Sequence, residues 1–316
     1  LVQQSTAVAA RAVDEGVAKR SLATDAYRER LKVRIGTGRE MMRQLMLKAR
    51  QLHPRIVFPE GESETILRAC AILVDEGIAS PILLGDEERI GRAAERLALD
   101  LGGAAIIDPG KSPRYEGYAE EYFRLRARDG VTRDMALSRM SDPAYFATLM
   151  LHSGDASMMV SGVASHFAES MRAVQDVIGP AEGAGCLSSL HMVLRPKQVY
   201  FLADCAVNIE PSAEELAEIA LLSAQLVRDL GIEPRVAMLS FSNFGSVDHP
   251  HARRVRQAAA IARERAPQLV IDGEVQLATA LDEEIRHRYF PFSDLREDAN
   301  VLVFPDLQSG LLALHL

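Results

Sequence analysis

The chain has 316 residues, of which 48% are hydrophobic and 25% are charged, values that are typical of a globular protein with an extensive core. Its formal net charge of −8 argues against a general nucleic-acid binder, because such proteins are basic. There is no apolar run of membrane-spanning length. Three scattered cysteines without a CxxC pair indicate a reducing compartment, the cytoplasm, and no structural zinc site.

Residues 1–51 predict a helical tail. An Ala/Val face predicts a first helix over residues 6–19, and Asp25 can cap a second helix that runs to Gln51. Gly36-Thr37-Gly38 interrupts the second pattern but is no dinucleotide fingerprint, because no strand precedes it. We place a domain boundary near residue 52. Because the chain starts with leucine and not methionine, we interpret it as a part of a longer protein.

From residue 55 onward, short apolar runs alternate with helical patterns. Strands are predicted at 56–58, 81–84, 104–107, 158–160, 199–202, 236–239, 269–271 and 301–304. Helices are predicted at 62–76, 87–99, 114–128, 132–138, 143–153, 166–177, 212–230 and 249–265. This alternation predicts an α/β fold of mainly parallel sheets with helices on both faces.

Ligands in such folds bind beyond the carboxyl ends of the strands. The strand at 236–239 is followed by a Ser/Gly loop, Ser240 to Ser246, and then by a helix. The loop N–H groups and the helix N-terminus could hold a phosphate. The alternative is an ordinary strand-to-helix turn with serine caps. Other polar strand ends lie at Ser161-Gly162, Asp204, 272–276 and Pro305-Asp306, so a shared cleft is our hypothesis.

Over about residues 52–316, a series of motifs resembles the phosphate acetyltransferase/butyryltransferase family. In chain order the motifs are Phe58 to Glu62, Ser161-Gly162 with Arg172, Phe201 to Asn208, Ala213 to Ala220, Gly231 to Ser240, Asp272-Gly273-Glu274 and Phe304 to Gly310. The loop Ser242 to Ser246 resembles the version found in large bacterial malic enzymes, where such a domain follows the oxidoreductase module. Residues 8–27 are similar to the segment that closes that module.

The resemblance implies two lobes with a cleft, preceded by the helical tail of residues 1–51. One lobe would comprise about 52–185 and 300–316, and the other about 186–299. The family's final strand–helix unit would lie beyond Leu316. We therefore expect the apolar run 311–316 to be frayed or packed against a partner.

The resemblance also implies residues that contact coenzyme A or phosphate. These are Arg172, Asp204, Asn208, Ser240, Ser242, Asn243, Gly245, Ser246 and Asp306. Each has a structural alternative. A helical arginine is often a solvated surface charge, and aspartate and asparagine at strand ends often form turns.

The departures from the family pattern bear on catalysis. Asn243 and Phe244 stand where active members resemble one another in a Thr-Lys pair, Ala278 replaces an aspartate, and Leu311 replaces an asparagine. The family's Ser-Arg-Gly motif, with its catalytic serine and arginine, is not in the chain. Acetyl transfer needs a base for the thiol and donors for the oxyanion, and no complete set remains. We expect binding without turnover, no catalytic residues and no metal ligands.

The function that the resemblance implies is that of an acetyl-CoA-sensing, oligomerising domain of a malic enzyme. The parent would decarboxylate malate to pyruvate with NADP and a divalent metal, Mg²⁺ or Mn²⁺, both bound in the oxidoreductase module. The domain would form a homodimer within a larger assembly, without nucleic acid or membrane partners. Two alternatives stay open: an active phosphate acetyltransferase that moves acetyl between coenzyme A and phosphate, and a domain that only holds an oligomer together.

Overall fold

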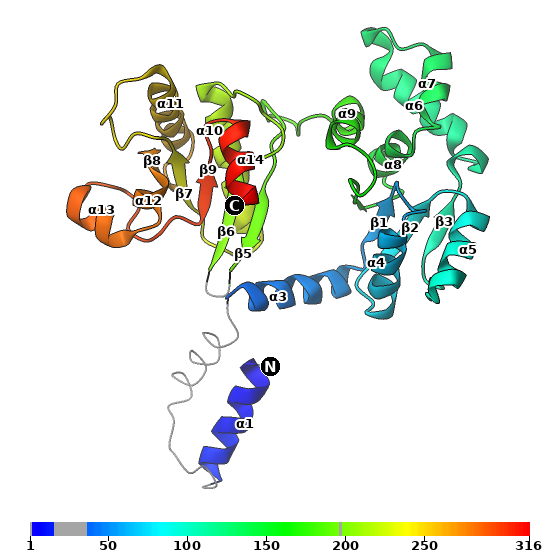
Figure 1. The fold of residues 1–316 in the computed structure, drawn as a ribbon, viewed down its shortest axis with the longest axis horizontal. Coiled ribbons are helices and arrows are strands. Elements are labelled where there is room, and N and C mark those ends of the chain that lie inside the picture. Colours follow the sequence, from blue (N-terminus) through cyan, green and yellow to red (C-terminus); the bar gives the residue numbers. More distant parts are fainter. Residues whose placement is uncertain (1, 16–36, 196–197) are drawn as a thin grey trace. The chain divides into compact units, whose positions relative to one another are not determined.

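The computed structural model describes residues 2–15, 37–195 and 198–316 (Figure 1). The chain divides into two compact units. We call residues 43–181 the first lobe, and residues 182–316 with the described residues up to 42 the second lobe. Helices α1 (Val2–Asp14) and α3 (Thr37–Leu52) form the described part of the expected helical tail, and residues 16–36 of that prediction lie outside the described part.

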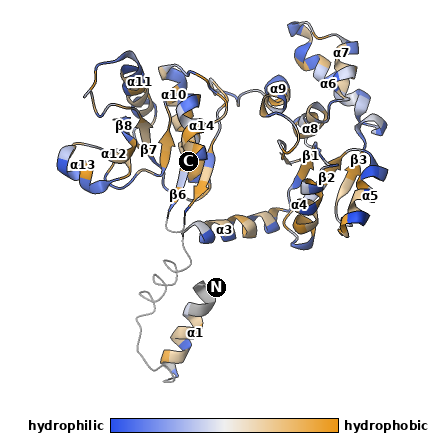
Figure 2. Cartoon of the chain, in the orientation of Figure 1, coloured by the Kyte–Doolittle hydropathy of each residue, from blue (hydrophilic) through white to orange (hydrophobic). Residues whose placement is uncertain are grey.

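The first lobe contains a four-stranded, entirely parallel sheet of order β3-β2-β1-β4. Its strands are β1 (Arg55–Phe58), β2 (Ser80–Leu84), β3 (Ala105–Ile107) and β4 (Met158–Met159). Because alternate strand residues face opposite sides, Ile56 and Phe58 join one core and Val57 joins another. Figure 2 shows the apolar strands between helices whose outer faces are polar.

Helices cover both faces of this sheet. On one face, helices α4 (Glu64–Asp75) and α5 (Glu87–Leu97) pack on Ile56 and Phe58 through Ile66, Leu67 and Ile90. The core on the other face is built from α6 (Tyr115–Arg126), α7 (Arg133–Arg139), α8 (Pro143–His152) and α9 (Phe167–Val177).

The second lobe contains a five-stranded sheet of order β5-β6-β9-β7-β8. Its strands are β5 (His191–Leu194), β6 (Val199–Ala203), β7 (Arg235–Leu239), β8 (Val270–Val275) and β9 (Val301–Val303). Only β5 runs antiparallel, against β6. The helices are α10 (Ala213–Asp229), α11 (Pro250–Arg265), α12 (Leu277–Ala280), α13 (Glu283–Tyr289) and α14 (Leu307–His315).

The structure differs from the expected lobe boundaries. Residues 300–316 do not belong with the first lobe, because β9 lies between β6 and β7 and pairs with both. The first boundary falls between residues 42 and 43, within α3, and not near residue 52. Strand β5 and helices α12 and α14 were not predicted.

The end of the chain is not frayed. Asp306 caps α14 by accepting a hydrogen bond from Ser309 N at 2.8 Å, and Leu314 packs against the core of the second lobe. Leu311, Leu312 and Leu316 are exposed, so partner packing of this run stays a prediction. Among the described residues, no helix has both the length and the apolar character that crossing a bilayer requires.

Candidate functional site

The polar loop after β7, residues 240–246, is closed by hydrogen bonds to Glu274 at the end of β8. Gly245 N donates to Glu274 Oε1 at 2.7 Å, and Phe244 N donates to the Glu274 carbonyl at 2.8 Å. The hydroxyl of the fully buried Ser242 donates to Glu274 Oε1 at 2.9 Å. Gly245 has a φ of +90°, a conformation that favours glycine.

Three further N–H groups of this loop are also engaged. Asn243 N donates to Ser246 Oγ at 2.9 Å, Ser246 N to the Asn243 carbonyl at 2.9 Å, and Ser242 N to Ser240 Oγ at 3.3 Å. Asn243 Oδ1 accepts from Gln276 N at 2.8 Å. The N–H groups of Ser242 to Ser246, which the sequence suggested as phosphate holders, are therefore already bonded within the chain: that of Gly245 to the Glu274 carboxylate, and the others to serine hydroxyls and backbone carbonyls.

Glu274 is held in its ionised form. Its side chain is inaccessible to solvent, and Arg256 of α11 contacts both carboxylate oxygens, at 2.8 and 2.9 Å. Burial by itself raises the pKa of Glu274, but the hydrogen bonds from Arg256, Gly245 and Ser242 outweigh it and hold the pKa below its ordinary value. The sequence singled out neither Arg256 nor this pairing.

The side chain of Phe244 packs against two other aromatic rings. Its ring lies 5.2 Å from that of Phe290 and 5.1 Å from that of Phe292, measured between centroids. Both neighbours lie at or just beyond the end of α13. The position that the sequence comparison associated with a cation therefore contributes an aromatic contact.

The loop after β6 is organised by Asp204. The carboxylate of Asp204, which is 2% exposed, accepts hydrogen bonds from Ala206 N at 3.0 Å and from Val207 N and Ser189 N, each at 3.2 Å. Asn208 donates to it twice, from N at 2.7 Å and from Nδ2 at 2.6 Å. Burial raises the pKa of Asp204, and hydrogen bonds from Ser189, Ala206 and Asn208 lower it further than burial raises it. This pattern matches the turn-forming alternative for Asp204 and Asn208.

A third loop, between β9 and α14, joins the same edge of the sheet. Leu307 N donates to the Ile209 carbonyl at 3.1 Å, which ties α14 to the loop after β6. Arg254 of α11 bridges both loops, donating to the Pro305 carbonyl at 3.0 Å and to Glu210 at 3.3 Å. Its Nε is buried and has no partner among the described residues. Arg254 is a cation at the carboxyl edge of this sheet that the sequence analysis missed.

The structure thus brings eight predicted site residues to the carboxyl edge of one sheet. They occupy the loops after β7 (Ser240, Ser242, Asn243, Gly245 and Ser246), after β6 (Asp204 and Asn208) and after β9 (Asp306). Arg172 belongs to α9 of the first lobe. Its side chain is exposed and forms no hydrogen bond or ion pair with the part of the chain that the structure describes.

The first lobe repeats the internal-carboxylate arrangement. Glu60, just after β1, accepts hydrogen bonds from four consecutive N–H groups after β4, at 3.1, 2.9, 2.8 and 2.7 Å for Gly162 to Ser165. Ser165 Oγ donates to it at 2.7 Å. Burial raises the pKa of Glu60, but these hydrogen bonds outweigh it and bring the pKa to about 2.

No cluster of three or more potential metal ligands is found among the described residues. The rings of His249 and His251 lie 4.9 Å apart, edge to face, and His249 Nδ1 accepts a hydrogen bond from His251 N. Histidines two positions apart meet here because His249 is the cap of α11 and not a helical residue.

Comparison with known proteins agrees with this architecture. The family described as Phosphate acetyl/butaryl transferase matches residues 40–316. The chain belongs to this family. A phosphotransacetylase crystal structure from Streptococcus pyogenes shares the fold, with a TM-score of 0.83 and 34% identity over 88% of this chain and 84% of that chain.

Phosphate acetyltransferases and NADP-dependent malic enzymes are both among the relatives of this chain. A phosphate acetyltransferase of Thermoanaerobacterium thermosaccharolyticum is 40% identical over 283 residues, 87% of this chain and 86% of that protein. An NADP-dependent malic enzyme of Escherichia coli is 38% identical over 321 residues, 100% of this chain. The chain spans only 42% of that malic enzyme and matches its C-terminal region.

Proposed function

We propose that the chain is a regulatory domain of an NADP-dependent malic enzyme that binds acetyl-CoA as an effector without transferring its acetyl group. The observation that carries the proposal is the loop after β7. In a member of a transferase family, the N–H groups of Ser242 to Ser246 are bonded within the chain, that of Gly245 to the Glu274 carboxylate, and Phe244 packs against two phenylalanines. The match along the whole chain to malic enzymes supports this parentage.

Catalysis is disfavoured by the hydrogen bonding of this loop. A phosphate that approached it would find the N–H groups of Ser242 to Ser246 already bonded within the chain and not an open set of donors. Displacing Glu274 would leave Arg256 without its partner and a buried carboxylate without donors, which is costly. The domain is therefore suited to hold coenzyme A while acetyl transfer is impaired.

Two arginines support binding of the coenzyme A phosphates. Arg172 of the first lobe is exposed and unpaired among the described residues, and Arg254 lies at the carboxyl edge of the second-lobe sheet, where it pairs with Glu210. Guanidinium groups match phosphate oxygens well. Effector binding would regulate the parent enzyme only where acetyl-CoA favours one conformation or assembly over another.

The binding claim is tested by calorimetric titration of this chain with acetyl-CoA and with coenzyme A. We expect saturable binding that Arg172→Ala and Arg254→Ala each weaken about tenfold or more, as for loss of a charge-assisted hydrogen bond. The matched control is Arg92→Ala, which removes an exposed arginine of α5 without a partner in the described structure and leaves affinity unchanged. Unchanged affinity in both test variants, or no saturable binding, contradicts the proposal.

We further propose that the parent is a cytoplasmic homo-oligomer that dimerises through this domain. Exposed apolar side chains of the second lobe, among them Tyr289, Phe292 and Leu312, support an interface. NADP and the divalent metal would then bind in the part of the parent enzyme that corresponds to the region of the malic-enzyme relatives not matched by this chain. Sedimentation of this chain as a monomer at micromolar concentration would contradict dimerisation through the domain.

A further inference from the structure

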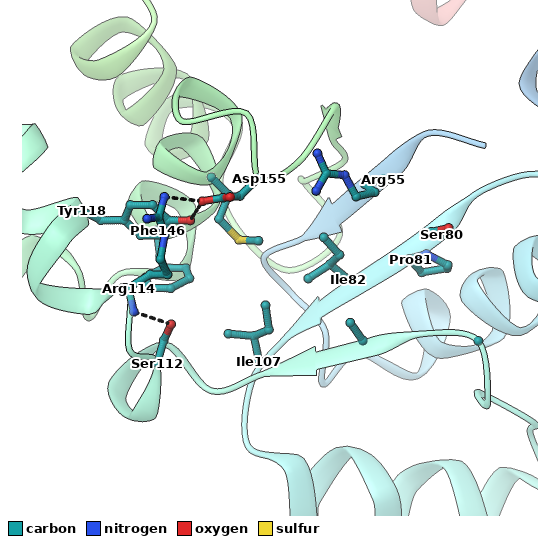
Figure 3. A pocket seen from close by; sticks show the side chains of 13 residues that line it. Arg55, Ser80, Pro81, Ile82, Ile107, Ser112, Arg114, Tyr118, Phe146 and Asp155 are labelled. Atoms are coloured by element: carbon teal, nitrogen blue, oxygen red, sulfur yellow. Dashed lines mark hydrogen bonds and ion pairs between the residues drawn. The ribbon is translucent and has the colours of Figure 1, made fainter. Parts of the chain in front are cut away.

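The first lobe contains a cavity at the edge of its sheet opposite the Glu60 loop. Arg55, Ser80 and Ala105 line it, and each stands at the start of a different strand, β1, β2 or β3 (Figure 3). The Glu60 carboxylate and its loop follow the other ends of β1 and β4. The cavity is thus separate from the carboxyl edges described above, and it has a volume of about 350 Å³.

One wall of the cavity is apolar. Ile82 and Ile107 rise from β2 and β3, and Phe146 faces them from α8 (Figure 3). Met150 of α8 also lines the cavity. Phe146 and Met150 belong to the buried core, at 1% and 3% exposure, so this wall is held rigidly. Such a wall favours an apolar body of a few carbon atoms.

The other wall carries the charged side chains of Arg55, Arg114 and Asp155. Arg114 donates to Asp155 Oδ2 at 2.6 Å, and Tyr118 Oη donates to the same oxygen at 2.5 Å. The Arg114 guanidinium also lies 4.9 Å from the centroid of the Tyr118 ring. Arg114 and Asp155 therefore neutralise each other in a fixed geometry.

Arg55 is the cation left over. One of its terminal nitrogens donates to the Gly154 carbonyl, a neutral partner, at 2.7 Å, and Arg55 forms no ion pair with the residues that the structure describes. Two guanidinium groups and one carboxylate give the cavity a net charge of plus one. A singly charged anion therefore complements it better than a neutral molecule or a dianion does.

We propose that this cavity binds a small monocarboxylate with a branched apolar body, its carboxylate on Arg55 and its body against Ile82, Ile107 and Phe146. A volume of 350 Å³ is at the lower end of small-ligand pockets, which span about 300–1,000 Å³. The ligand class thus differs from coenzyme A, and the site lies on the first lobe alone. Its existence does not depend on the function proposed above.

The test is a titration of the whole chain with 4-methylpentanoate, followed by calorimetry or by chemical-shift changes of the ligand. The probe's uncharged amide and inorganic phosphate are titrated in parallel. We expect saturable binding of the carboxylate in the millimolar range, with the amide and phosphate weaker by about tenfold or more.

Two variants locate the site. Arg55→Gln removes the cation and weakens carboxylate binding about tenfold or more, while leaving the amide unchanged. Ala105→Phe fills the cavity from an exposed strand position and abolishes binding of both. Arg92→Gln, an exposed arginine of the same lobe, is the control, and circular dichroism checks that each variant is folded.

Several outcomes overturn the proposal. Absence of saturable carboxylate binding by the folded wild-type chain does so, and so does equal affinity for acid and amide. Tighter binding of phosphate would overturn the monoanion assignment. Unchanged affinity in both Arg55→Gln and Ala105→Phe would place any observed binding elsewhere on the chain.

Discussion

Glu60 and Asp204 each place a carboxylate against several loop N–H groups at the end of a strand, and Glu274 places one against Gly245 N and the Ser242 hydroxyl. At the residue scale, these carboxylates accept hydrogen bonds from backbone N–H groups, as a bound anion does in a phosphate-binding loop. Each pKa lies below its ordinary value because the donors favour the ionised form more strongly than burial disfavours it. Replacing one of these carboxylates therefore measures how much of the stability of the loop depends on it.

Glu274→Ala is expected to lower the free energy of unfolding by about 2–4 kcal/mol. The variant leaves Arg256 unpaired and takes the acceptor from Ser242 and Gly245 N. Urea unfolding measures the change. Glu264→Ala, an exposed position on α11, is the control and should shift stability by less than about 0.5 kcal/mol. Equal effects of the two substitutions would show that the loop does not depend on Glu274.

Glu60 predicts a dependence of stability on pH. A carboxylate whose folded pKa is depressed stabilises the fold above its unfolded pKa, and this contribution is lost as pH falls through the folded pKa. For Glu60 the window runs from its ordinary value of 4.5 down to about 2. Because the group is partly accessible to water, we expect a contribution of about 1–2 kcal/mol at neutral pH.

The corresponding measurement compares wild type with Glu60→Gln in urea unfolding from pH 7 to pH 3. The wild type should be more stable at pH 7, and the difference should shrink below pH 4.5 as the carboxylate takes up its proton. Glu116→Gln, an exposed helical position of the same lobe, should show no such convergence. A stability difference that stays constant over this range would mean that the carboxylate charge is not what holds the loop.

At the scale of the elements, α14 packs closely against the loop after β6. Gly310 of α14 has no side chain, and a Cβ there would lie 2.5 Å from the Asp204 carbonyl oxygen and 3.2 Å from Cys205 Sγ. The first contact is with backbone and cannot be relieved by a rotamer change. A glycine in a helix interior otherwise costs stability, so its presence here reflects packing.

A pair of glycine substitutions tests this docking. Gly310→Ala should destabilise the second lobe by about 1–3 kcal/mol because of the forced backbone shift. Gly91→Ala in α5 meets nothing within 4 Å and should stabilise by about 0.5–1 kcal/mol through helix propensity. Thermal unfolding of both variants is the readout, and a stabilising Gly310→Ala would show that α14 does not pack as described.

At the scale of the whole molecule, the strand–helix alternation of the sequence predicted most of the fold. The strands at 56–58, 81–84 and 236–239 lie within β1, β2 and β7 because continuous apolar runs mark strands buried on both faces. Strand β5 was missed, since it is partly exposed and antiparallel at the sheet edge. The place of β9 could not be predicted, because a crossover that inserts a strand between two earlier ones leaves no mark in local sequence.

The candidate site was predicted in position but not in detail. The polar residues were correctly placed at strand ends, yet the sequence could not show that the carboxylate of Glu274, about thirty positions from the loop, accepts hydrogen bonds from Ser242 and Gly245. Arg254 was missed because the residues around a helical arginine in the sequence do not indicate that it contacts two separate loops. Both contacts are consequences of tertiary packing.

The central claim, binding of acetyl-CoA without transfer, is tested most directly by titrating acetyl-CoA into the chain in phosphate-containing buffer inside a calorimeter. The account predicts a saturable isotherm in which heat flow returns to baseline after each injection, with acetyl-CoA recovered intact. Continuing heat flow accompanied by release of free coenzyme A and acetyl phosphate would contradict the loss of transfer. An isotherm without saturable heat would contradict binding.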